Sequence, residues 1–103
     1  MADAGGFVAV LVIDVHFPES GSLKGKRKEL SSLKAQLQTR LHVAVSEVDH
    51  HDLWQRSTLA VAVTGGSESE VHRSIDRVDR FVADRCPQGH RMEATVVSFQ
   101  EVL

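Results

Sequence analysis

Alternating apolar and polar positions predict a first strand over residues 7–17. One face of this strand would carry Phe7, Ala9, Leu11, Ile13, Val15 and Phe17, and the other would begin with Val8, Val10 and Val12. Both faces are apolar over the first half, which is typical of a central strand covered on both sides. Pro18 ends the strand, because proline has no N–H group to donate to a sheet.

A helical period then appears twice. Ser22 is placed to cap a first helix, whose apolar stripe is Leu23, Leu30, Leu33, Leu37 and Leu41. After Gly65 and Gly66, the spacing of Ser67 and Glu70 is that of a capping box. The second helix carries Val71, Ile75, Val78 and Val82 and runs to about Arg85, where residues 86–89 (Cys-Pro-Gln-Gly) end it.

Three further strands are predicted over residues 42–48, 56–64 and 91–102. The resulting order, βαββαβ, predicts an α+β fold of the ferredoxin-like kind, with an antiparallel sheet and two helices on one face. A chain of 103 residues fits a single domain spanning residues 1–103, with residues 1–6 as a flexible N-terminus. In this fold the loops at residues 20–28, 49–56 and 86–91 meet at one end of the sheet, where binding residues are often found.

Charge is distributed unevenly, although the net charge is only −2. Residues 19–41 sum to +4 and the other residues to −6. The positive charges of that segment gather at the start of the first helix, in Lys24, Lys26, Arg27 and Lys28. Helix starts favour acidic residues, and each cation there costs up to about 1 kcal/mol. Free N–H groups beside these cations would form a phosphate site, and the alternative is a solvated basic face.

The loop after the second predicted strand carries Trp54, Gln55 and Arg56. Trp54 is the only tryptophan, and it could stack on a base, anchor a protein partner, or close the end of its own core. Arg56 could bind phosphate or pair internally with Glu47, Asp49 or Asp52.

Metal binding and catalysis find little support in the sequence. His50, His51, His90 and Cys86 would lie at one end of the fold, but they form no C-x-x-C or H-x-x-x-H pair, so we expect no metal and no cofactor. Cys86 with His90, or Asp14 with His16, would be a weak catalytic pair. Acylphosphatases, which share this fold, need a catalytic asparagine, and the chain has none, so that activity is excluded. We expect a protein that is not an enzyme.

The sheet face opposite the helices would consist of Val8, Val10, Val12, Ala44, Ser46, Ala60 and Ala62. It contains no aromatic residue for stacking on bases in the manner of RNA-recognition motifs. An exposed apolar face usually marks an interface, so we expect a homodimer or higher oligomer through Val8, Val10, Val12, Ala60 and Ala62. The alternative is a monomer that tolerates the patch.

The expected compartment is the cytoplasm. A single cysteine allows no internal disulfide, which suits a reducing environment. The N-terminus lacks the basic start of a secretion signal, and no apolar run approaches the roughly 18 residues of a membrane span.

Two segments carry a resemblance to a known family. Residues 22–27 (Ser-Leu-Lys-Gly-Lys-Arg) and 47–56 (Glu-Val-Asp-His-His-Asp-Leu-Trp-Gln-Arg) resemble the two signatures of the YlxP-like proteins, a bacterial domain family of unknown function numbered 503. The matching positions are Leu23, Lys24, Lys26, Arg27, Glu47, Asp52, Trp54, Gln55 and Arg56. The resemblance implies a ferredoxin-like fold and a small cytoplasmic protein. The neighbouring genes in that family, for translation initiation factor 2 and ribosome-binding factor A, imply a role near ribosome maturation or RNA.

Together these features predict a non-enzymatic protein that binds RNA or the ribosome. Phosphate would contact Lys24, Lys26, Arg27 and Lys28, and Trp54, Gln55 and Arg56 would complete the surface. A homo-oligomeric module that binds a protein partner is the second hypothesis, and an enzyme acting on small anions is the third.

Overall fold

The computed structural model describes residues 5–18, 21–87 and 89–102, so most of the N-terminus expected to be flexible lies outside it. The strands are β1 (Phe7–His16), β2 (Ala44–Asp49), β3 (Arg56–Gly65) and β4 (His90–Ser98). The helices are α1 (Leu23–Leu41), α2 (Glu68–Arg85) and a short α3 (Phe99–Val102). The βαββαβ order predicted from the sequence is therefore confirmed, with one helix added at its end.

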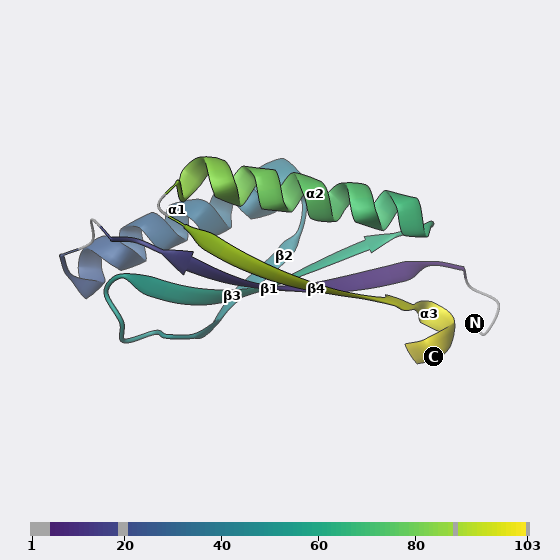
Figure 1. The fold of residues 1–103 in the computed structure, drawn as a ribbon, viewed down its shortest axis with the longest axis horizontal. Coiled ribbons are helices and arrows are strands. Elements are labelled where there is room, and N and C mark those ends of the chain that lie inside the picture. Colours follow the sequence, from purple (N-terminus) through teal and green to yellow (C-terminus); the bar gives the residue numbers. More distant parts are fainter. Residues whose placement is uncertain (1–4, 19–20, 88, 103) are drawn as a thin grey trace.

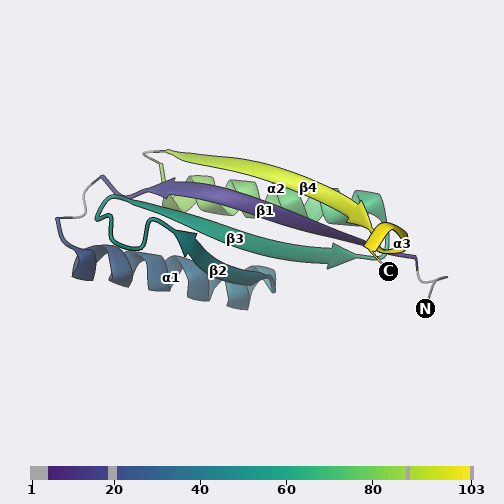
Figure 2. The same cartoon turned by 90° about the horizontal axis from the view of Figure 1, so that it is seen from below.

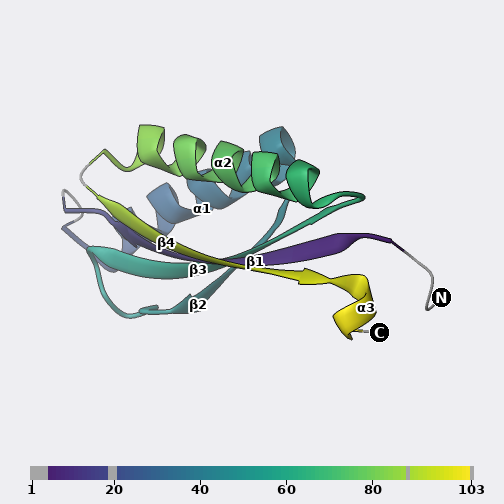
Figure 3. The same cartoon turned by 45° about the vertical axis from the view of Figure 1, so that its right-hand side comes forward.

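The strands form one antiparallel sheet in the order β2-β3-β1-β4. Both long helices cover the same face of this sheet, and the other face is open (Figures 1 and 3). Figure 2, from the open side, shows β1 and β3 in the middle and β2 and β4 at the edges. This is the ferredoxin-like topology. No helix in the described ranges is long and apolar enough to cross a membrane.

The core lies between the sheet and the two helices. From β1 it receives the face predicted from the alternation, with Ala9, Leu11, Ile13 and Val15 fully buried. Opposite them stand Leu30, Leu33 and Leu37 of α1 and Val71, Ile75, Val78 and Val82 of α2. Leu23 and Leu41, at the ends of the predicted α1 stripe, are only partly buried.

Both long helices begin as predicted. The side chain of Ser22 accepts a hydrogen bond from the N–H of Gly25 at 3.1 Å, and Ser67 accepts one from Glu70 at 3.2 Å. The Glu70 carboxylate reaches back to accept from the N–H of Gly66 at 3.0 Å. The first two contacts satisfy N–H groups that a helix start leaves without partners, and the third ties Glu70 to the residue before the N-cap of α2.

The predicted last strand, residues 91–102, is too long. β4 ends at Ser98, whose hydroxyl accepts a hydrogen bond from the N–H of Gln100, while the Glu101 carboxylate accepts from the N–H of Ser98. Ser98 and Glu101 therefore form a capping box that starts α3. The N–H of Phe99 donates to the carbonyl of Gly6 at 2.9 Å, which holds α3 against the start of β1. The predicted second strand was also shifted, because His42 takes a left-handed conformation that ends α1.

The open face of the sheet has the composition that the alternation predicted. Val10 and Val12 are 46% and 43% exposed, and they lie between Ala60 and Ala62 of β3 and Glu93 and Thr95 of β4. Val8, Ala60 and Ala62 are half-buried, whereas Ala44 and Ser46 at the β2 edge are exposed.

Candidate functional site

Three loops meet at the end of the sheet where β1 finishes, as the topology predicted. The N–H of Phe17 donates to the carbonyl of Gln55 at 2.7 Å, and the Gln55 side chain donates to the carbonyl of Pro18 at 3.2 Å. On the other side, the N–H of His16 donates to the carbonyl of Gly89 at 3.3 Å. The segment that follows β1, the β2–β3 loop and the α2–β4 loop are thus joined around one strand end.

Lys26 does not lie on the surface of this end, and its expected role as a phosphate contact is wrong. Its side chain is 1% exposed, and its ammonium lies 3.3 Å from the Glu47 carboxylate. The same nitrogen donates to the carbonyls of His50 at 2.6 Å and His51 at 3.2 Å. An ammonium has three N–H donors, so these three oxygens leave it no donor for an RNA phosphate.

Glu47 is the partner that explains a lysine in the core. Its carboxylate also accepts a hydrogen bond from the buried hydroxyl of Ser57 and lies 3.8 Å from the His51 ring. Burial alone would raise the pKa of Glu47, but hydrogen bonds from Ser57 and Lys26 and the charges of Lys26 and His51 together lower it below the ordinary value of 4.5. The surroundings of Glu47 therefore favour the ionised form of its side chain.

This arrangement predicts a loss of stability in acid. Because the folded protein lowers the pKa of Glu47, the unfolded chain takes up the proton first as the pH falls below 4.5. The stabilisation from the carboxylate is fully present at neutral pH and is lost as the pH falls through the folded pKa. We expect Glu47→Gln to have a flatter dependence of unfolding free energy on pH between neutrality and pH 3 in urea titrations.

The matched control is Glu93→Gln, which removes an exposed carboxylate from β4. It should keep the acid sensitivity of the unmodified protein. Equal pH dependence in Glu47→Gln and the unmodified protein would show that the Lys26–Glu47 pair is not a source of the acid loss.

The Lys26 ammonium also fixes the β2–β3 loop. His50 has a positive φ of 63°, a left-handed conformation that is uncommon for residues other than glycine. Its carbonyl accepts from both Lys26 and the N–H of Leu53, and its own N–H donates to the Asp49 carboxylate at 2.7 Å. The tight turn that results presents the next residues to solvent.

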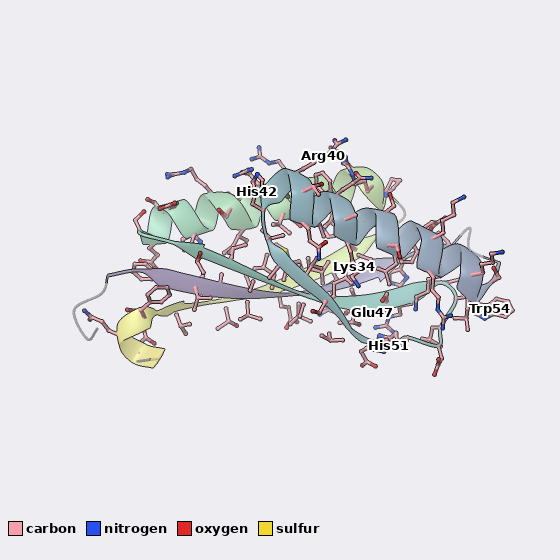
Figure 4. The ribbon with its side chains drawn as sticks, turned by 180° about the vertical axis from the view of Figure 1, so that it is seen from behind. Lys34, Arg40, His42, Glu47, His51 and Trp54 are labelled. Atoms are coloured by element: carbon pink, nitrogen blue, oxygen red, sulfur yellow. The ribbon has the colours of Figure 1, made fainter. Side chains whose placement is uncertain are left out.

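Trp54 stands on the outside of this turn. It is 53% exposed, so it does not close the end of the core, which was one of the alternatives left open by the sequence. Figure 4 shows Trp54 at the end of the molecule where α1 begins, with Glu47 and His51 further from that end. An exposed tryptophan on a loop held by buried hydrogen bonds is available for stacking.

The other cations predicted at this end are on the surface. Lys24, Arg27 and Lys28 are exposed on the first two turns of α1. Arg56 is also exposed, and its guanidinium lies 3.8 Å from the Asp14 carboxylate. Its acidic neighbour is thus Asp14 across the sheet, and not Glu47, Asp49 or Asp52 as its position in the sequence suggested.

Asp14 belongs to a hydrogen-bonded row on the open face. The hydroxyl of Thr58 donates to the Asp14 carboxylate at 2.6 Å, and Nδ1 of His50 lies 2.8 Å from the same hydroxyl. Since a hydroxyl has only one hydrogen, Nδ1 of His50 must donate to Thr58. The row ties the turn at His50 to the middle of the sheet. Asp14, which the sequence offered as a catalytic partner of His16, thus has a structural partner in Thr58.

Two grooves border this strand end, and His16 lines both of them. One, of about 580 Å³, is lined also by Asp52, Leu53, Trp54, Gln55 and Arg56. The other, of about 660 Å³, lies between α1 and α2 and includes Lys28, Gln36 and Arg85. Sequence reasoning missed Gln36 and Arg85, because no local pattern relates residues that approach each other only when the two helices pack.

His90 and Cys86, the other candidate metal ligands, lie in surroundings that give each a structural role. His90 lies 2.6 Å from the Asp79 carboxylate, and Cys86 is buried, where burial and then the charge of Glu29 raise the pKa of its thiol above the ordinary 9.0. In residues 5–18, 21–87 and 89–102, no three His, Cys, Asp or Glu side chains lie close enough to hold a metal ion.

Two sequence comparisons support the resemblance seen in the two signature segments. Residues 8–96 match the family described as "Protein of unknown function (DUF503)". The uncharacterized protein YlxP of Bacillus subtilis (strain 168) is 32% identical over 73 residues, which are 71% of this chain and 78% of that protein. Neither description names an activity or a partner.

Solved structures share the fold. The de novo designed protein Foldit4 aligns with a TM-score of 0.54 at 14% identity, over 89% of this chain and 96% of the design. The VAO-type flavoprotein MtVAO713 from Myceliophthora thermophila C1 aligns with a TM-score of 0.53 at 13% identity, over 94% of this chain but only 18% of the flavoprotein. Identities this low bear on the fold alone.

Proposed function

Since the chain belongs to the DUF503 family of proteins of unknown function, we propose a role argued from its own surface: it is a non-enzymatic protein that binds RNA, free or within the ribosome. The observation that carries the proposal is that exposed cations and an exposed tryptophan come from two segments joined at one end of the sheet. Lys24, Arg27 and Lys28 are exposed at the start of α1, Trp54 is exposed on the β2–β3 loop, and Lys26 bonds this part of α1 to that loop. Exposed cations supply phosphate contacts, and an exposed tryptophan supplies a stacking surface for a base.

The charge distribution supports an interface confined to one end. Three exposed cations, Lys24, Arg27 and Lys28, lie in the first two turns of α1, whereas the residues outside 19–41 sum to −6 and would not attract a nucleic acid. The open sheet face carries no aromatic residue on its central strands, so base stacking is assigned to Trp54 on the loop. Gln55 and Arg56, next to Trp54 and exposed, lie on the same surface.

Trp54 provides a direct test, because it is the only tryptophan. Addition of a short single-stranded RNA should quench its fluorescence in a saturable way. Stacking of one base contributes about 1–3 kcal/mol, so Trp54→Ala should weaken RNA binding by at least about fivefold, as measured by fluorescence anisotropy of labelled RNA.

The control for this experiment is Trp54→Phe, which keeps a ring and should retain most of the affinity. The proposal fails if RNA binds with the same affinity to the Trp54→Ala variant and leaves the tryptophan fluorescence of the unmodified protein unchanged.

A second function is favoured by the open sheet face, which would make the protein a homo-oligomeric interaction module. Val10 and Val12 are neighbours on β1, about half exposed, and flanked by the small residues Ala60 and Ala62. Small residues allow another sheet to approach closely, and Val8 extends the apolar strip along β1. The faces of two copies would then cover each other.

This second function predicts that Val10→Glu gives a monomer whatever the protein concentration. A carboxylate at that position would be buried without a partner in a face-to-face dimer, which is strongly unfavourable. Light scattering of the unmodified protein should give at least twice the chain mass. A monomeric mass for both proteins at high concentration would exclude the oligomer.

A further inference from the structure

The groove between α1 and α2 has an apolar floor and a polar rim. Its floor contains the buried residues Phe17, Leu33 and Cys86, and its rim contains Lys28, Ser32, Gln36 and Arg85. A volume of about 660 Å³ is within the range of small-molecule sites. The groove is thus large enough for a compact organic ligand with one polar end.

Arg85 is held in place before any ligand arrives. Its guanidinium carbon lies 3.5 Å from the centre of the Phe81 ring, and its Nε donates to the Gln36 side chain at 2.6 Å. The bond to Gln36 uses Nε and not the two terminal nitrogens, whose fork can bind phosphate or carboxylate in a bidentate manner. An arginine already ordered loses less conformational entropy on binding.

The charges around the groove favour an anion. Lys28 and Arg85 are basic residues on opposite helices, whereas Glu29 is the one acidic residue that the described part of the chain contributes to the lining. His16 lines both this groove and the groove that contains Trp54, so the two grooves are neighbours. An RNA strand that contacts Trp54 would thus pass close to the α1–α2 groove.

We infer that the α1–α2 groove binds a single nucleotide, with its base on the apolar floor and its phosphate at Lys28 and Arg85. The choice of a nucleotide among organic anions rests on the proposed RNA binding. A free mononucleotide and one unstacked nucleotide of an RNA have the same base and phosphate chemistry, so the groove accepts either source.

The test is an NMR titration of the full chain with adenosine monophosphate, adenosine and inorganic phosphate. Adenosine monophosphate should shift the signals of Leu33, Cys86 and the Gln36 side chain. The concentration of adenosine monophosphate that gives half-saturation should be at least tenfold lower than that of adenosine or of inorganic phosphate. Arg85→Gln should weaken this binding at least tenfold. Arg77→Gln, an exposed arginine on α2 outside the groove lining, should leave it unchanged.

Titration with a short RNA separates this inference from the proposed function. Shifts at Lys24, Arg27 and Trp54 without any shift in the groove, and no groove response to adenosine monophosphate, would overturn the nucleotide site while RNA binding stands. Groove shifts with adenosine monophosphate, but none at Trp54 with RNA, would support a site for a free mononucleotide and contradict RNA binding. An unchanged spectrum of Arg85→Gln outside the groove confirms that the variant is folded.

Discussion

Replacing Lys26 with methionine is expected to lower the free energy of unfolding by about 3 kcal/mol, because it removes one partner of an internal ion pair and leaves the other charge unpaired. The value is at the lower end for buried pairs, since the Glu47 side chain keeps 17% of its exposure whereas Lys26 keeps 1%. The carbonyls of His50 and His51 would lose a donor as well. Urea denaturation at neutral pH measures the effect.

Two variants make this expectation specific. Lys24→Met removes an exposed cation from the same turn and should change the free energy of unfolding by no more than about 0.5 kcal/mol. The double variant Lys26→Met with Glu47→Gln should lose less than Lys26→Met alone, because no charge is left unpaired. Equal losses in Lys24→Met and Lys26→Met would contradict the internal ion pair.

The role of Lys26 shows what a count of charges along the sequence misses. Four cations in the first two turns of a helix predict a basic surface, and three of them are indeed exposed. The fourth is turned inward because residues 26, 30, 33 and 37 follow one another at helical spacing, and these are the buried positions of α1. A stripe extended backwards from Leu30 leads to Lys26, so the spacing held a signal that the residue type obscured.

The core of the fold was predictable for a simple reason. In β1, Ala9, Leu11, Ile13 and Val15 alternate with positions on the open face and are buried, as the pattern predicts. The expectation that the first half of this strand is covered on both sides was wrong, because Val10 and Val12 on the other face are 46% and 43% exposed. The end of β4 was not predictable in this way. Val96 and Val97 continue the apolar pattern, but the capping contacts of Ser98 and Glu101 end the strand. Local hydrogen bonds decided the boundary against the hydrophobic pattern.

The site itself was predictable only in part. Topology brought Trp54, Arg56 and the start of α1 to one end, since loops at the same end of a ferredoxin-like sheet must meet. The pairing of Arg56 with Asp14 depends on the register of β1 and β3, and the contact of Arg85 with Gln36 depends on how the helices pack. Neither follows from residues close in sequence.

The exposed cations of α1 give the second large effect. Replacing Lys24, Arg27 and Lys28 together with glutamine should weaken binding of single-stranded RNA by on the order of a hundredfold near 0.1 M salt, since each phosphate contact on a single strand contributes about 0.7 to the slope of log affinity against log salt. The three side chains are exposed, so the folded state should be retained. Fluorescence anisotropy of labelled RNA measures the affinity.

A matched triple variant controls for total charge. Replacing Arg73, Arg77 and Arg80 with glutamine removes the same three positive charges from the exposed side of α2. If RNA binds at the start of α1, this control should lose far less affinity than the α1 variant. Equal losses would mean that RNA responds to net charge and not to a site.

The most direct test is the salt dependence of RNA affinity between about 50 mM and about 200 mM salt, measured for the unmodified protein and for the α1 triple variant. We predict a steep negative slope for the unmodified protein and a slope smaller in magnitude by about 2 for the variant, because three phosphate contacts are gone. Identical slopes in the two proteins, or no RNA binding by the unmodified protein at the lower salt, would contradict the proposal that this end of the molecule binds RNA.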